Sequence, residues 1–358
     1  MKMPLGLLLA LYSAIAFVAG AAPAQDQASR PADKEARRAA RVADSPTSAP
    51  AERVRRRAAR VVDSPTSASA ERRPQRKMAW VDPDTSAPPG TRYKTFHSPT
   101  INGDVSYLIY LPPDYETSTD KRYPVVYWLH GSGSNQRRGA EMVARLDPAI
   151  RGGRAQPMIV VLVNGLAAQT MYCNTPDGKW PLESVIIKDL IPRIDASYRT
   201  IAKREARGVE GFSMGGFGAA HLGFKYPDLF GVVSILAPAL LGPDLPGNAP
   251  RRKWEDLFST ALGGDLAYFQ ANSPYELAVK NAAKLRGRSI IRIVPHGPAE
   301  NWLIPRCEKL HALLDENGIR NDLIVCASVQ QHNLELVYDT LGDKGIGFFT
   351  DAFPKEQN

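Results

Sequence analysis

The sequence predicts an α/β fold in which helices cover both faces of a mostly parallel sheet. Short apolar runs alternate with segments of helical periodicity from about Trp80 to the C-terminus. Some of these runs, such as Val125–Leu129 and Met158–Val163, are apolar at every position, as expected of strands buried on both faces. The chain has 358 residues, of which 44% are hydrophobic, and this is enough for one large buried core.

The strands are predicted from alternating or continuous apolar runs that turn or polar residues bound. In chain order they are Arg92–Phe96, Val105–Leu111, Val125–Leu129, Met158–Val163, Arg207–Gly211, Val232–Leu236, Ser289–Val294 and Asp322–Ala327. Because parallel neighbours need a crossover connection, strands that alternate with helices favour a parallel sheet.

The helices are predicted from apolar residues at helical spacing. They are Glu183–Tyr198, the Gly- and Ala-rich segment Met214–Tyr226, Trp302–Asn317, and Asn333–Phe349 with a break near Gly342. Residues 237–287 lack this rhythm, and we expect a lid or a side-pocket insertion there.

The first residues have the pattern of a secretory signal peptide, which we expect to span residues 1–24. Lys2 precedes an apolar stretch from Leu5 to Val18, and small residues follow up to Ala24. This layout is typical of a cleaved leader, and the stretch is shorter than the about 20 residues of a spanning helix. We therefore expect a secreted or periplasmic protein without a stable membrane span.

Residues 25–77 are predicted to form a disordered basic linker. Residues 37–53 and 56–72 match at 15 of 17 positions with an offset of 19, and each copy contains Ser-Pro and few large apolar residues. Two such copies cannot bury a core. The net charge of +8 lies in residues 30–77, and residues 78–358 carry 30 basic and 30 acidic side chains. Nucleic-acid binding by the domain at 78–358 is therefore not expected, while the linker could contact anionic envelope polymers.

The three cysteines leave the redox state open. Cys307 and Cys326 fall on a predicted helix and the strand that follows it, so they are the first choice for a disulfide in an oxidising compartment. Three separate buried thiols, Cys173 included, are the alternative. No two cysteines are spaced as zinc ligands are, and no metal or organic cofactor is implied.

The motif Gly211-Phe212-Ser213-Met214-Gly215 predicts a nucleophilic serine. It follows a strand and opens a helix, and its glycines permit the sharp turn that raises a serine above a sheet. A serine hydroxyl also needs donors for the negative charge that develops on the attacked carbonyl oxygen. We expect these from the backbone N–H groups of Met214 and of Ser132, in His130-Gly131-Ser132-Gly133.

The catalytic base is predicted to be His332. In this architecture the chain order is Ser, acid, His, which excludes His97 and His130. His221 lies two helical turns beyond Ser213, and His311 lies in the middle of a predicted helix. His332 follows the last predicted strand, where a loop would return it to Ser213.

The acid that orients His332 is predicted to be Glu300. It is the only carboxylate in His296-Gly297-Pro298-Ala299-Glu300-Asn301, which follows the strand Ser289–Val294. A glutamate is chemically adequate in this role. Asp315 and Asp322 are more distant alternatives, and a solvated glutamate at a helix N-terminus is the non-catalytic interpretation.

These motifs together resemble the "Putative esterase" family of α/β-hydrolases. The resemblance runs from about Tyr107 to Phe349, and it covers Tyr110–Tyr115, Tyr123–Gly131, Asp189–Pro192, Gly211–Gly216 and Lys225–Phe230. The family includes S-formylglutathione hydrolase, feruloyl and acetyl-xylan esterases, ferric-enterochelin esterases and mycolyltransferases. It usually has aspartate where this chain has Glu300.

The resemblance implies an α/β-hydrolase fold at 78–358 and a serine esterase that works through an acyl-enzyme. With the expected export, a feruloyl or acetyl ester on a carbohydrate is the first choice of substrate. A siderophore esterase and an acyltransferase to a sugar are alternatives. A non-catalytic envelope binding protein of the same fold is the alternative of another class.

Overall fold

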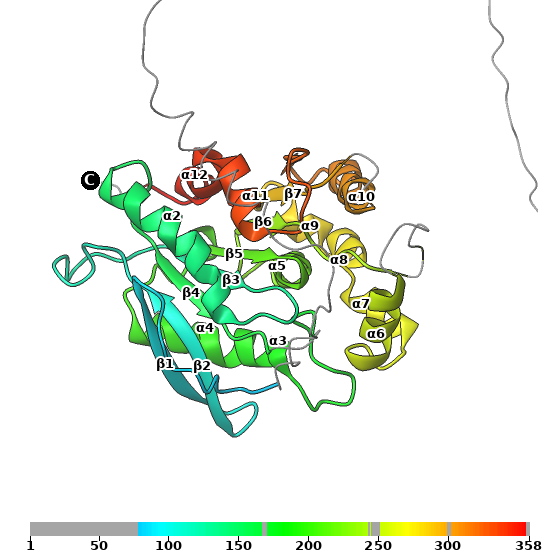
Figure 1. Ribbon diagram of the computed structural model, residues 1–358, viewed down its shortest axis with the longest axis horizontal. Helices are drawn as coiled ribbons and strands as arrows, with labels where there is room; N and C mark the ends of the chain where they lie inside the picture. Colours follow the sequence, from blue (N-terminus) through cyan, green and yellow to red (C-terminus); the bar gives the residue numbers. More distant parts are fainter. Residues whose placement is uncertain (1–77, 167–169, 243, 245–250, 299–301, 356–358) are drawn as a thin grey trace, which may run out of the picture. The chain divides into compact units, whose positions relative to one another are not determined.

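The structure is a computed structural model that describes residues 78–166, 170–242, 244, 251–298 and 302–355 (Figure 1). The predicted signal peptide and linker, with its duplicated segment, lie outside the described residues. No helix in the described ranges is long and apolar enough to cross a membrane.

The core is a sheet of eight strands whose central members are buried along their whole length. The strands are β1 Thr91–Ser98, β2 Gly103–Tyr110, β3 Val125–Leu129, β4 Ile159–Val163, β5 Arg207–Phe212, β6 Val232–Leu236, β7 Ile290–Val294 and β8 Asn321–Leu323. Their order is β1-β2-β4-β3-β5-β6-β7-β8. The pairings of β1 with β2 and of β2 with β4 are antiparallel, and all others are parallel.

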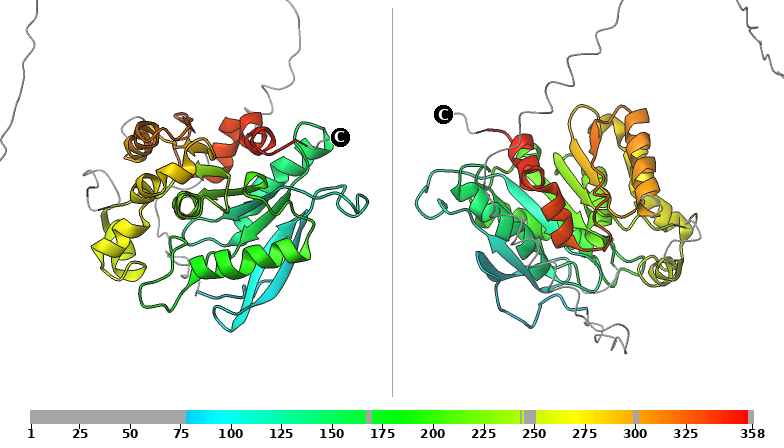
Figure 2. Two further views of the ribbon diagram at one scale, coloured as in Figure 1. Left: turned by 180° about the vertical axis from the view of Figure 1, so that it is seen from behind. Right: turned by 45° about the horizontal axis from the view of Figure 1, so that its top comes forward.

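The helices lie on both faces of this sheet. They are α2 Ala140–Arg151, α3 Leu182–Ser184, α4 Ile191–Ser197, α5 Met214–Lys225, α6 Arg251–Thr260, α7 Leu266–Asn272, α8 Pro274–Lys280, α9 Ala282–Leu285, α10 Leu303–Glu316, α11 Leu334–Leu341 and α12 Asp343–Ala352, with short 3₁₀ turns η1 Gln136–Gly139 and η3 Arg204–Ala206 and the wider π-helical segment η2 Val185–Leu190. Helix α2 packs with α11 and α12, while α5 packs with α8. Figure 1 shows α2 in front of the sheet, and the view from behind in Figure 2 shows α4 in front. The predicted α/β-hydrolase fold is confirmed.

Three features differ from the expectations. The strand predicted at Asp322–Ala327 ends at Leu323, because the chain then turns and Cys326 forms only a single bridge, with His296. The segment η1–α2 was not predicted. In the described part of residues 237–287 the chain forms four helices, α6 to α9, and α8 packs on α5 and α10.

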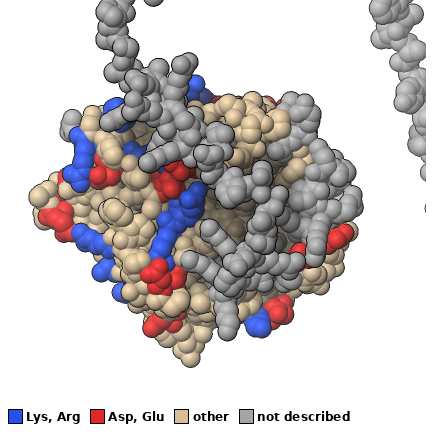
Figure 3. All heavy atoms as spheres, viewed as in Figure 1, with Lys and Arg blue, Asp and Glu red and all other residues tan. Residues whose placement is uncertain are grey.

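The surface of the domain carries charges of both signs, as its equal numbers of basic and acidic residues predict. Basic and acidic side chains are interspersed on the face shown in Figure 3, without a continuous basic patch among the residues described there.

Cys173, Cys307 and Cys326 are buried free thiols, so the alternative without a disulfide is the one observed. Burial raises the pKa of the Cys307 thiol well above its usual range, and this keeps it protonated and unreactive.

A row of buried polar side chains crosses the centre of the sheet. Trp128, Glu210, Ser234 and Arg292 occupy paired positions on β3, β5, β6 and β7. Arg292 Nη2 donates to Glu210 Oε2 at 2.8 Å, and its Nε donates to Ser234 Oγ at 2.8 Å. Ser234 Oγ in turn donates to Glu210 Oε2 at 2.6 Å.

Helices α11 and α12 complete this row. The Tyr338 hydroxyl donates to Glu210 and accepts from Trp128 Nε1 at 3.1 Å. The remaining donors of Arg292 reach the carbonyls of Lys344 and Gly345 at 2.8 and 2.9 Å. Each side chain of the ion pair is only 1% exposed. A buried ion pair is tolerated when its hydrogen bonds are satisfied, and this one ties four strands to the helical layer.

We predict that Arg292→Ala lowers the free energy of unfolding by about 3–5 kcal/mol, because it leaves the Glu210 carboxylate buried without its counterion. Lys284→Ala, which breaks an exposed pair with Asp228, is the control and should cost no more than about 1 kcal/mol. Chemical denaturation measures both. Equal costs would show that the buried row contributes little to stability.

Candidate active site

Ser213 lies on the sharp turn between β5 and α5. Its backbone has φ 62° and ψ −116°, a conformation that costs a non-glycine residue about 1–3 kcal/mol. Two hydrogen bonds hold the turn, since Ser213 N donates to the Leu236 carbonyl at 3.0 Å and Ala239 N donates to the Ser213 carbonyl at 2.9 Å. The side chain is partly exposed. The strand-to-helix context predicted for this serine is thus observed.

This turn requires glycine at two positions, because neighbouring backbone atoms occupy the space that a side chain would need. A Cβ at Gly211 would lie 2.0 Å from the Gly215 carbonyl oxygen. A Cβ at Gly215 would lie 2.0 Å from the Leu129 carbonyl oxygen, at the end of β3. Real Cβ atoms do not approach an oxygen so closely, so the turn requires glycine at both positions.

The loop after β3 lies directly against Ser213. A Cβ built on Gly131 would be 3.2 Å from the Ser213 Cβ and 3.7 Å from its Oγ. Ser132 follows and is exposed. Met214 is the first residue of α5, where backbone N–H groups have no partner within the helix. The two predicted oxyanion donors therefore lie on segments that flank the serine.

His130 has a structural role in this loop. Its Nε2 accepts a hydrogen bond from Gly165 N at 3.0 Å, and its carbonyl accepts from the Tyr172 hydroxyl at 2.9 Å. His130 is fully buried, as is Tyr172. Tyr172 itself has φ 59°, so a strained backbone segment supports the loop that carries Gly131. The sequence did not indicate this contribution of Tyr172.

His332 lies beside the serine turn. It precedes Asn333, whose side-chain oxygen caps α11 by accepting from Glu335 N and Leu336 N. The imidazole is exposed and stacks on the Phe212 ring, with 4.6 Å between ring centroids. Its Nδ1 lies 2.8 Å from Nε2 of His296. The structure thus brings His332 next to the residue that precedes Ser213.

The other candidates lie elsewhere or cannot be placed. Glu300 lies outside the described residues. Asp315 binds Asn321 Nδ2 at 2.8 Å and lies near His311, while Asp322 is exposed on β8. His97 is exposed and lies 3.5 Å from Asp104.

A second buried cluster joins α5 to Glu183 on α3 and to Cys173 in the loop before α3. Glu183 Oε2 lies 2.7 Å from His221 Nε2, and Cys173 Sγ lies 3.7 Å from the same nitrogen. These three groups are close enough to share a metal ion. However, Lys225 Nζ lies 2.9 Å from Glu183 Oε1, and the Tyr226 hydroxyl donates to the same carboxylate. The Glu183 carboxylate is therefore already paired with the Lys225 ammonium, and we assign this cluster a structural role.

The pKa values agree with an ionised cluster. Burial alone would raise the pKa of Glu183, but the hydrogen bond and charge of His221, with the hydrogen bonds from Tyr226 and Lys225, lower it to about 2. Burial alone would lower the pKa of His221, but Cys173 and Glu183 raise it to about 10. His221 is thus fixed by an ion pair, and this placement also agrees with its exclusion as the base.

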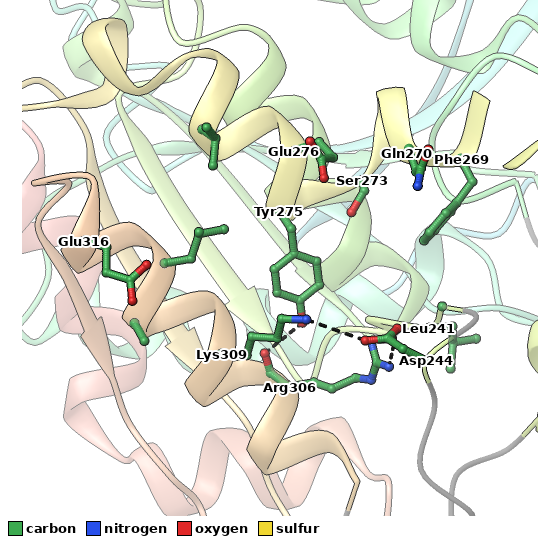
Figure 4. Close-up of a pocket in the computed structure, with 14 residues that line it drawn as sticks. Leu241, Asp244, Phe269, Gln270, Ser273, Tyr275, Glu276, Arg306, Lys309 and Glu316 are labelled. Carbon is green, nitrogen blue, oxygen red and sulfur yellow. Dashed lines mark hydrogen bonds and ion pairs between the residues drawn. The ribbon is translucent and has the colours of Figure 1, made fainter. Parts of the chain in front are cut away.

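The structure also contains a cavity of about 580 Å³ between α7, α8 and α10. Its walls include Tyr275, Lys309 and Arg306, and Arg306 Nη2 donates to Asp244 at 2.8 Å (Figure 4). Neither Ser213 nor His332 lines this cavity. Part of its wall comes from Leu241, Gly242 and Asp244 and from α7 and α8, within the segment 237–287.

The comparisons with known proteins agree with this geometry. The family described as "Putative esterase" matches residues 98–300, which is more than half of the chain, and the chain belongs to it. Esterase Rv1288 of Mycobacterium tuberculosis is 32% identical over 223 residues, covering 59% of this chain and 47% of the relative. The endo-1,4-beta-xylanase/feruloyl esterase of Xylanibacter ruminicola is 30% identical over 161 residues, covering 42% of this chain and 22% of the relative.

A solved structure supports the fold. A ferulic acid esterase superposes with a TM-score of 0.61 at 24% identity, covering 74% of this chain and 98% of that one. The present chain spans about half the length of the mycobacterial relative. The expected family membership is confirmed, and this domain is an esterase-family hydrolase domain.

We predict that the stability of the domain falls as the pH decreases from about 4.5 toward 2. Glu183 has a folded-state pKa of about 2 against an ordinary value of 4.5. Its lowered pKa stabilises the fold above 4.5 by about 3 kcal/mol, and this is lost as the carboxylate protonates. Thermal unfolding at several pH values measures it. Glu183→Gln should remove part of this decrease in stability. The control Glu116→Gln, which changes an exposed pair with Arg92, should not. The same dependence of stability on pH in the wild-type protein and in Glu183→Gln would contradict the lowered pKa of Glu183.

Proposed function

We propose that the protein is an exported serine esterase that hydrolyses a carboxylic ester through an acyl-enzyme on Ser213. The observation that carries the proposal is the turn at Ser213, because it is a strained, glycine-dependent structure with the oxyanion loop at Gly131 on one side. The His332 ring stacks on the ring of Phe212, the residue before Ser213. Backbone strain of this kind is retained where a site needs it, and membership of the esterase family supports the same chemistry.

The proposed reaction has two acyl-transfer steps. Ser213 Oγ attacks the ester carbonyl carbon while His332 Nε2 takes the hydroxyl proton. The backbone N–H groups of Met214 and Ser132 stabilise the oxyanion. The alkoxide leaves with the proton from His332, and the acyl group stays on the serine. Water then attacks the acyl carbon while His332 takes a proton from it. The bond from the acyl carbon to Ser213 Oγ breaks as His332 returns this proton to Oγ, which gives the carboxylic acid and free Ser213.

The proposed substrate is a feruloyl or acetyl ester linked to a carbohydrate. Support comes from the relative whose printed name includes feruloyl esterase. The partly exposed Ser213 and the exposed His332 also suit an ester whose alcohol part is large. Export is proposed from the pattern of residues 1–24, and contact of the basic linker 25–77 with anionic envelope polymers from its charge; both regions lie outside the described residues.

The proposed roles predict kinetic losses of different size. Ser213→Ala and His332→Ala should each lower kcat for p-nitrophenyl acetate by at least about 10³-fold, because each removes a group that makes or breaks bonds. Glu300→Gln should lower kcat if this carboxylate stabilises the imidazolium form of His332. His311→Ala, which replaces a histidine bonded to Asn321, is the control and should leave kcat unchanged. Full activity of Ser213→Ala would contradict the proposal.

The proposed substrate class predicts an order of reactivity. Among p-nitrophenyl acetate, butyrate and octanoate, kcat/KM should be greatest for acetate, and methyl ferulate should be hydrolysed with release of ferulate. Steady-state assays by absorbance, with Ser213→Ala to subtract the uncatalysed rate, measure both. A preference for octanoate without turnover of methyl ferulate would exclude the feruloyl and acetyl class while leaving the serine mechanism intact.

A further inference from the structure

His296 occupies a fixed place beside the proposed catalytic histidine. It lies two residues beyond the end of β7 and is only 3% exposed. Its backbone pairs with Cys326 in a parallel bridge, and Cys326 N donates to the Pro295 carbonyl at 2.9 Å. The bridge extends the pairing of β7 and β8 after β8 itself has ended. It therefore joins the two loops that carry His296 and His332.

The loop that carries His332 is also anchored at Cys326. Val329 N donates to the Cys326 carbonyl at 3.1 Å, and Asn333 N donates to the Gln331 carbonyl at 2.7 Å. The His332 ring contacts both the Phe212 ring and the His296 ring, with centroid separations of 4.6 and 5.1 Å. Because backbone hydrogen bonds hold both loops in place, they also fix the 2.8 Å separation of His296 Nε2 and His332 Nδ1.

A contact between two neutral imidazoles requires one proton between the facing nitrogens. Either His332 Nδ1–H donates to His296 Nε2, or His296 Nε2–H donates to His332 Nδ1. Only the first arrangement leaves the lone pair of His332 on Nε2, where it can take the Ser213 proton. The hydrogen bond at Nδ1 therefore decides whether His332 can act as the base.

The burial of His296 keeps its ring neutral. Burial lowers its pKa, although the backbone of Val329 raises it in part, so the ring is neutral at pH 7. Nδ1 of His296 is buried and has no hydrogen-bond partner among the described residues, so the 2.8 Å contact with His332 is the interaction that selects the tautomer of His296. The arrangement with the proton on Nδ1 leaves the lone pair on Nε2, and it is the one that the proposed catalysis requires.

We propose that His296 is a positioning residue whose Nε2 accepts the Nδ1–H of His332 and so directs the His332 Nε2 lone pair toward Ser213. This inference rests on the proposed serine esterase function. A neutral imidazole orients its partner as a carboxylate does, but it adds no negative charge to stabilise the imidazolium that forms during the reaction. Orientation then comes from His296, and charge stabilisation is left to other groups such as the predicted Glu300.

Two substitutions at this position separate shape from hydrogen bonding. His296→Phe keeps an aromatic ring but removes the acceptor, whereas His296→Gln places an amide oxygen near the position of Nε2. For p-nitrophenyl acetate we expect His296→Phe to lower kcat at least about tenfold with little change in KM, since a wrong tautomer affects the chemical step. His296→Gln should recover most of the loss. His311→Phe is the matched control on α10 and should retain wild-type kcat.

The tautomer of His332 gives a readout that a purely structural role would not change. In ¹⁵N NMR spectra, Nδ1 of His332 should have the shift of a protonated ring nitrogen in the wild-type protein and in His296→Gln. In His296→Phe the proton should move to Nε2. The wild-type spectrum alone decides the case if His296→Phe does not fold, because an Nε2–H tautomer there would overturn the proposal.

Other results would also overturn it. Wild-type kcat in folded His296→Phe would show that the contact has no role in positioning. A change of tautomer in Glu300→Gln, with none in His296→Phe, would assign the Nδ1 proton to the carboxylate. Failure of the proposed function is distinguishable, because Ser213→Ala would then keep full activity while the tautomer of His332 could still be measured.

Discussion

The buried row Trp128–Glu210–Ser234–Arg292 is the constraint on which the rest of the structure depends. It links four neighbouring strands at paired positions, and every charged atom in it has a hydrogen-bond partner within the sheet or on α11 and α12. Register in a parallel sheet is otherwise set mainly by apolar packing, in which many side chains are interchangeable. An ion pair at one register position penalises a one-residue slip, because a slip would leave both charges unpaired.

The serine turn follows from this fixed strand. Glu210 lies three residues before Ser213, so the register of β5 determines where the turn is formed. Close packing holds the turn, because Gly211 leaves room for the Gly215 carbonyl and Gly215 lets α5 approach the Leu129 carbonyl. Leu236, the last residue of β6, and Ala239 beyond it bind Ser213 through backbone hydrogen bonds. The loop after β3, supported by His130 and Tyr172, then lies against the serine.

Much of this could be predicted from the sequence, for identifiable reasons. Strands such as Val125–Leu129 and Val232–Leu236 have the predicted bounds because buried parallel strands leave a continuous apolar pattern. The Ser213 turn could be placed because glycines are required on both sides. Helix α2 is not predicted although its buried residues Met142, Val143, Leu146 and Ala149 have helical spacing, because Pro148 lies inside it. The short helices α6–α9 depend on tertiary contacts that no local pattern records.

The relationships between distant residues could not be predicted. The pairing of Glu210 with Arg292 joins positions 82 residues apart, and their charges gave no sign that both are buried. His296 was assigned no role, because only the bridge to Cys326 brings it to His332. The sequence points instead to Glu300, the only carboxylate of the loop, and that assignment stays a prediction.

The central claim, that Ser213 is the nucleophile, is tested most directly by mapping the adduct of a fluorophosphonate on the folded protein. The account predicts one modified tryptic peptide with the added mass on Ser213, and it predicts that heat-unfolded protein is not labelled, because the reactivity arises from the turn and its neighbours. Labelling at another residue, or no labelling of folded protein, would contradict the account.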